Sequence, residues 1–115
     1  MLEVDDAFFT ELVDEAMGEV PPHLASAIAN VQVIVEDANR DEPDMLGLYE
    51  GVPLTERGDS YAGVLPDRIY IYRRPLLRMC ETIFELADEV RVTVLHEIAH
   101  HFGIDDADLD EWGWG

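Results

Sequence analysis

The feature that most constrains this chain is a segment that would be apolar on nearly every side of a helix. Residues 89–102 carry apolar side chains at helical spacing, and Gly103 follows where such a helix would end. The expected core stripe is Val92, Leu95, Ala99 and Phe102, to which Val90, Val94 and Ile98 add apolar flanks. A helix of this kind belongs in the interior, so we expect the domain to be built around it.

Two histidines and a glutamate interrupt this apolar helix, in the run His96-Glu97-Ile98-Ala99-His100. Because an α-helix has about 3.6 residues per turn, the two imidazoles project from one face, about 6 Å apart along the axis. That spacing lets them share one Zn²⁺, and the Glu97 carboxylate can reach a water on the metal. Burying these groups without a partner would be costly, so the run predicts a zinc site with Glu97 as the catalytic base.

A third metal ligand is expected just after this helix. Gly103 lets the chain turn back, so that Asp106 can approach the metal from another direction, in the pattern H-E-x-x-H-x-x-G-x-x-D. With three protein ligands, a catalytic zinc keeps a further position for water. The neighbouring Asp105 and Asp108 remain alternatives for this ligand, because the segment is rich in acids.

Other reactive side chains receive less specific interpretations. His101 lies beside the motif but points about 100° away from His100, so a surface position or a supporting role is expected. His23 is interpreted as a loop histidine, and the single Cys80 as a core residue that has no cysteine partner for an internal disulfide. We expect the four tyrosines to be half-buried aromatic residues of strands or loops. The alternative is that a hydroxyl donates a hydrogen bond to a substrate oxyanion; the four are Tyr49, Tyr61, Tyr70 and Tyr72.

The rest of the chain has the pattern of short helices and strands without a linker, so we expect a single domain over residues 1–115. The first expected elements are a helix with apolar positions from Phe8 to Met17, capped by Asp5 or Asp6 and ended by Gly18, then a strand at 31–35 and a short extended segment at 45–49. They are followed by a loop at 51–63, a strand at 68–73, and a helix from Pro75 to Ala87 that breaks near Asp88. This order predicts a small α+β domain.

Charge sets the composition apart, since 7 Lys and Arg residues stand against 26 Asp and Glu residues for a net charge of −19. Such a surface repels nucleic-acid phosphates and anionic membranes, so neither is expected as a partner. No apolar run approaches the ~18 residues of a membrane span, and the start of the chain lacks the basic residues of a signal peptide. We therefore expect a cytoplasmic protein.

The motif resembles that of the zincin clan and, within it, the metzincin motif with aspartate as the third ligand. More closely, GLYEGVPLTERG at 47–58, RIYIYR at 68–73 and HEIAHHFGIDD at 96–106 look like the small bacterial zincin-like domain family, described as neutral zinc metallopeptidases. The resemblance implies a minimal zincin/metzincin-like fold, with a short mixed or antiparallel sheet packed against an active-site helix. It also implies that His96, His100 and Asp106 bind the metal and that Glu97 is catalytic.

Three functions are compatible with these residues. The preferred one is a zinc peptidase that acts on peptides or unfolded proteins, with the segment 45–49 as the sheet edge along which a substrate lies. A non-catalytic metal-binding module is the first alternative. Larger metzincins have a methionine turn after the third ligand, whereas here all four methionines precede His96 and nine residues follow Asp106.

The second alternative is a metal-dependent endoribonuclease. A bacterial RNA-processing family resembles this motif, with the pattern H-x-x-x-H-x-x-G-x-x-H on a similar small fold. That pattern lacks a glutamate after the first histidine and ends in histidine, and RNA binding requires a basic surface. Glu97, Asp106 and the net charge of −19 therefore argue against it.

Overall fold

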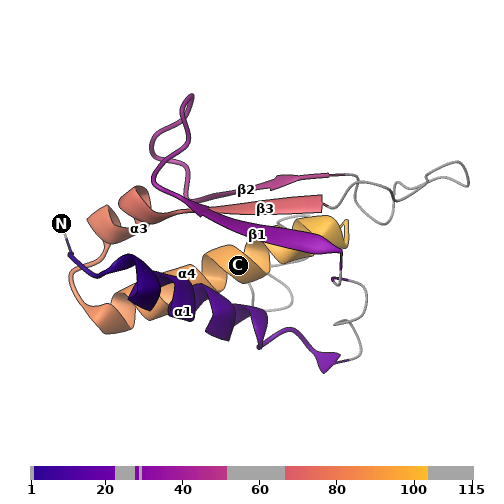
Figure 1. The fold of residues 1–115 in the computed structure, drawn as a ribbon, viewed down its shortest axis with the longest axis horizontal. Helices are drawn as coiled ribbons and strands as arrows, with labels where there is room; N and C mark the ends of the chain where they lie inside the picture. Colours follow the sequence, from indigo (N-terminus) through magenta and orange to yellow (C-terminus); the bar gives the residue numbers. More distant parts are fainter. Residues whose placement is uncertain (1, 23–27, 29, 52–66, 104–115) are drawn as a thin grey trace, which may run out of the picture.

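The structure, a computed structural model, describes residues 2–22, 28, 30–51 and 67–103. A three-stranded sheet forms one layer, and two long helices that lie side by side form the other (Figure 1). The sheet contains β1 (Val31–Glu36), β2 (Gly47–Glu50) and β3 (Asp67–Tyr72). The helices are α1 (Asp6–Met17), the short α3 (Arg73–Met79) and α4 (Ile83–His101). The predicted α+β class, with a short sheet against a helix, is confirmed.

The sheet is mixed, with the strand order β1-β3-β2. β1 runs parallel to the central strand β3, and β2 runs antiparallel to it. The predicted alternation in β3 places Ile69 and Ile71 in the core with no exposed surface, while Tyr70 on the other face is half-buried. Tyr72 is also buried, and its hydroxyl accepts a hydrogen bond of 3.0 Å from the side-chain amide of Asn39. The mixed order leaves β2 at one edge of the sheet.

α4 packs against α1 on one side and against β2 and β3 on another. Its deepest stripe has no exposed surface and consists of Leu86, Val90, Val94 and Ile98. The predicted stripe is therefore only partly right, because Val92 and Phe102 remain partly exposed while the expected flank forms the centre of the core. Among the residues that the structure describes, no helix has both the length and the apolar character that crossing a bilayer requires.

α1 begins and ends where the sequence predicts. The Asp5 side chain caps the helix, since its Oδ1 accepts a hydrogen bond of 2.7 Å from the Phe8 amide. Gly18 follows the last turn. The face of α1 that meets α4 carries Phe9, Leu12, Val13 and Ala16, all buried. This packing supplies an apolar partner for the buried stripe of α4.

The predicted break near Asp88 is wrong. α3 ends at Met79, Cys80 is extended, and α4 then runs without interruption from Ile83 to His101. Thr82 starts the helix, because its hydroxyl accepts a hydrogen bond of 3.1 Å from the Glu85 amide and lies 3.2 Å from the Glu85 carboxylate. The side chains of Thr82 and Glu85 thus meet in the first turn, in a T-x-x-E sequence typical of helix starts, which apolar periodicity alone does not reveal. Burial raises the pKa of the Cys80 thiol, as expected of a core residue.

We predict that Thr82→Ala lowers the free energy of unfolding by about 1 kcal/mol, because the first turn of α4 loses its side-chain cap. Urea denaturation followed by circular dichroism measures the change. Thr10→Ala is the matched control, since Thr10 is exposed within α1 and should change stability by less than about 0.5 kcal/mol. Equal stability of the two variants would show that this cap does not define the start of α4.

Candidate metal centre

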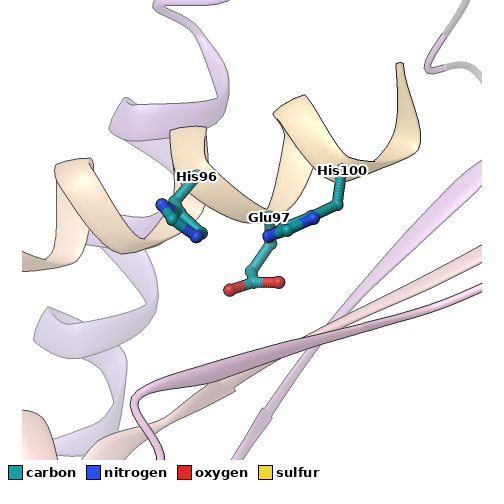
Figure 2. Close-up of side chains that lie close together, drawn as sticks. All are labelled: His96, Glu97 and His100. Carbon is teal, nitrogen blue, oxygen red and sulfur yellow. The ribbon is translucent and has the colours of Figure 1, made fainter. Parts of the chain in front are cut away.

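The structure brings together His96, Glu97 and His100 on one side of α4. One nitrogen of each histidine and a carboxylate oxygen of Glu97 all lie within 4.8 Å of one another. The two imidazole rings meet edge to face, with 4.9 Å between their centroids and 62° between their planes. Figure 2 shows the three side chains projecting from the helix toward the strands of the sheet. The predicted convergence of the two imidazoles on one face is thus present.

The burial of these three residues is graded. Glu97 is 8% exposed, whereas His96 and His100 are half-buried. A carboxylate in such a position is largely withdrawn from bulk water, while the histidines remain accessible from one side. The cluster can therefore receive a ligand from solvent without exposing the carboxylate fully.

Gly47, the first residue of β2, allows the strand to lie directly against this cluster. A Cβ atom at Gly47 would be 2.9 Å from the Thr93 methyl, 3.1 Å from the Tyr70 carbonyl oxygen and 3.2 Å from Glu97 Cγ. Any side chain at this position would push β2 away from α4. The glycine in the predicted extended segment thus marks a close approach of the strand to Glu97.

The donors of the cluster fit a metal ion of zinc's chemistry. Zinc in proteins takes imidazole nitrogens and carboxylate oxygens at about 2.0–2.2 Å, so two nitrogens on one ion lie at most about 4 Å apart. Small side-chain rotations would bring His96 and His100 to that separation from their present positions. Their assignment as ligands, and that of Glu97 as the base, stays a prediction.

The third ligand lies outside the described residues. Asp106, which the sequence favours, and the alternatives Asp105 and Asp108 all follow Gly103, the last residue that the structure describes. Gly103 itself has a φ of 76°, a left-handed conformation that glycine adopts readily and other residues resist. The predicted glycine at the end of the helix is therefore confirmed.

A buried polar network, which sequence reasoning missed, lies beside the cluster. Asp67, the first residue of β3, is 2% exposed, and its Oδ2 lies 2.5 Å from Nδ1 of His101. The same oxygen accepts a hydrogen bond of 2.7 Å from the Tyr49 hydroxyl. His101 is also 2% exposed, so its expected surface position is wrong. The turn of about 100° between successive helix residues directs the His101 side chain away from His100 and into the protein interior.

This network joins the last turn of α4 to two strands. Tyr49 belongs to β2, Asp67 to β3 and His101 to α4, and no sequence motif connects the three. Gly51 makes room for them, since a Cβ atom there would lie 2.5 Å from the Asp67 carboxyl carbon and 2.8 Å from the Tyr49 hydroxyl oxygen. The contact anchors the residue next to His100 and thereby limits movement of the helix end that carries it.

The other expected tyrosine and histidine positions have mixed outcomes. Tyr49 is a half-buried strand aromatic, as expected, and its hydroxyl donates to Asp67. Tyr70 and Tyr72 stack on each other, with 6.3 Å between ring centroids and 6° between planes. Tyr61 and His23 lie outside the described residues.

We predict that Asp67→Ala lowers the free energy of unfolding by about 3 kcal/mol, because it leaves the buried His101 ring and Tyr49 hydroxyl without their shared acceptor. Chemical denaturation measures the effect. Asp88→Asn is the control, since Asp88 is exposed and its ion pair with Arg91 should contribute under about 1 kcal/mol. A loss of less than about 1 kcal/mol in Asp67→Ala would mean that the network does not anchor the end of α4.

Comparison with known proteins identifies the family of this chain. No curated protein matches the chain. A solved structure, of a conserved hypothetical protein from Thermus thermophilus, is similar, with 26% sequence identity and a TM-score of 0.61 over 86% of this chain and 94% of that one. The model of the zincin-like metallopeptidase family matches residues 28–114, which include the whole sheet and α4. The chain belongs to the zincin-like metallopeptidase family.

Proposed function

We propose that the protein is a zinc-dependent peptidase that hydrolyses peptide bonds in peptides or unfolded proteins. The observation that carries the proposal is the convergence of His96, Glu97 and His100 on one side of a buried helix. Membership of the zincin-like metallopeptidase family supports the same reaction. The acidic net charge disfavours a nucleic-acid substrate, which is the substrate of the ribonuclease alternative.

In this proposal His96 and His100 hold the zinc ion, and Asp106 completes the protein ligands. When bound, zinc supplies Lewis-acid chemistry, which lowers the pKa of a water toward about 7 and polarises a carbonyl oxygen. The half-buried position of the two histidines suits this role, because the site must admit a peptide as well as the ion. The Asp67 network steadies the end of α4 beside His100.

Glu97 is the proposed general base and acid. Its carboxylate accepts the proton of the attacking water and then delivers it to the amine that leaves. The side chain is well placed for this because its Cγ packs close to Gly47 and its oxygens lie with the histidine nitrogens. Packing against the strand limits the rotamers available to Glu97, and a fixed orientation favours proton transfer.

The edge strand β2 is the proposed binding site for the substrate backbone. Of the strands that the structure describes, β2 pairs with β3 and with no other. An extended peptide can hydrogen-bond to such an edge and so extend the sheet. Because Gly47 lies against Glu97, a peptide on this edge would pass beside the proposed metal site.

We predict that the protein purified without added metal contains about one zinc per chain, as expected for a catalytic zinc site. His96→Ala should lose the zinc because one of the two imidazoles is gone, whereas Glu97→Gln should retain it. Elemental analysis gives the metal content, and circular dichroism checks that each variant is folded. Absence of stoichiometric zinc, both as purified and after adding zinc back, would contradict the proposed function.

We further predict that Glu97→Gln lowers kcat/KM for peptide cleavage by about 10²- to 10⁴-fold, because the amide cannot accept the proton of water. Cleavage of a peptide library by zinc-loaded protein is the measurement. Asp88→Asn, which removes one charge from the exposed side of α4, should keep full activity. Full activity in Glu97→Gln would overturn the mechanism, and no cleavage by the natural sequence would favour a non-catalytic metal-binding module.

A further inference from the structure

A hollow of about 270 Å³ lies between the start of β2 and α4, and it opens onto the proposed catalytic residues. Leu46 and Gly47 line it on the strand side, and His96 and Glu97 are among the residues that line it on the helix side. Pockets for drug-sized ligands usually measure about 300–1,000 Å³, so this hollow is suited to a single side chain. Its position makes it a candidate site for the substrate residue next to the cleaved bond.

Two neighbouring residues on the helix wall of the hollow present aliphatic groups. Val92 and Thr93 line it one turn before the histidine motif. The Thr93 hydroxyl donates a hydrogen bond of 2.8 Å to the Glu89 carbonyl oxygen, and its methyl carbon lies 2.9 Å from where a Cβ of Gly47 would be. Thr93 thus satisfies its polar group within the helix and presents a methyl group toward the strand. With Leu46 opposite, these side chains can pack along an unbranched aliphatic stem.

A carboxylate lies farther along the same wall. Glu89 lines the hollow and is half-buried, seven residues before His96 on the same face of α4. Seven residues correspond to about 10 Å along a helix axis. A cation beside Glu89 would therefore lie about two helical turns from a metal held at His96, too far for direct contact with it.

The charges that line the hollow are all compatible with a cation. Its lining contains two carboxylates, Glu89 and Glu97, and among the described residues that line it there is no lysine or arginine. The one arginine of α4, Arg91, lines a different hollow and pairs with Asp88 at 3.0 Å. An acidic substrate side chain would be repelled here, and an apolar one would leave Glu89 without a cationic partner.

We infer that the hollow is a specificity pocket for a lysine or arginine side chain next to the cleaved peptide bond, with Glu89 as the residue that selects it. The aliphatic stem packs against Leu46 and Val92, and the cation reaches the Glu89 carboxylate. The inference rests on the proposed peptidase function and names the substrate class of the same site. The net charge of −19 would further attract cationic segments of peptides or unfolded proteins.

The test uses two series of peptides, one that varies only the residue before the cleaved bond and one that varies only the residue after it. The varied residue is lysine, arginine, norleucine, acetyl-lysine or glutamate. The natural protein, loaded with zinc, should cleave the lysine peptide about 5- to 10-fold more efficiently than the norleucine peptide, as expected of one partly buried ion pair. Glu89→Gln should reduce this ratio to about one, and Glu89→Lys should shift the preference to glutamate. Asp88→Asn, which removes the same charge from outside the hollow, should leave the ratio unchanged.

The outcomes separate this inference from the proposed function. Cleavage with no lysine preference, or with a preference that survives Glu89→Gln, would overturn the pocket assignment while the peptidase function stands. If no peptide is cleaved, the proposed function fails. Peptide binding then tests whether the hollow prefers a lysine side chain. Fluorescence anisotropy with the lysine and norleucine peptides should show tighter binding of the lysine peptide that Glu89→Gln abolishes, and equal binding of the two would overturn the inference.

Discussion

The packing of the apolar stripe of α4 against α1 and the sheet holds the domain together. One stripe of this helix fills the core against α1 and the sheet, and it can do so because Val90, Val94 and Ile98 have no polar groups to satisfy. The same helix must then carry its polar residues on the remaining face. His96, Glu97 and His100 occupy that face, so the element that stabilises the domain also holds the proposed active site rigidly.

Two close contacts position the side chains of the proposed site. Gly47 brings the edge strand against Glu97, and the absence of a Cβ atom is what permits the distance. Asp67 connects the last turn of α4 to β3 through His101 and to β2 through Tyr49. The first contact sets where a peptide could lie relative to the carboxylate, and the second limits motion at the end of the helix.

The distribution of charge gives this small site a chemical preference. Acidic residues outnumber basic residues in the whole chain, and the hollow beside Glu97 is likewise acidic because Glu89 lines it. A carboxylate near bulk water contributes modestly to binding, but a half-buried one discriminates more strongly between cationic and neutral side chains. Reaction and selectivity would therefore come from two regions of one helix face.

Elements with local signals could be predicted from the sequence. Helical periodicity located α4, the spacing of His96, Glu97 and His100 placed them on one face, and Gly103 marked the end of the helix. Periodicity misplaced the start of α4, because an apolar pattern does not register the side-chain hydrogen bond by which Thr82 begins the helix. The position of β3 between β1 and β2 depends on tertiary packing, and so do the contact of Asp67 with His101 and the hollow beside Glu97. Those contacts join residues far apart in the chain, and their pairing depends on how whole elements pack rather than on any local spacing.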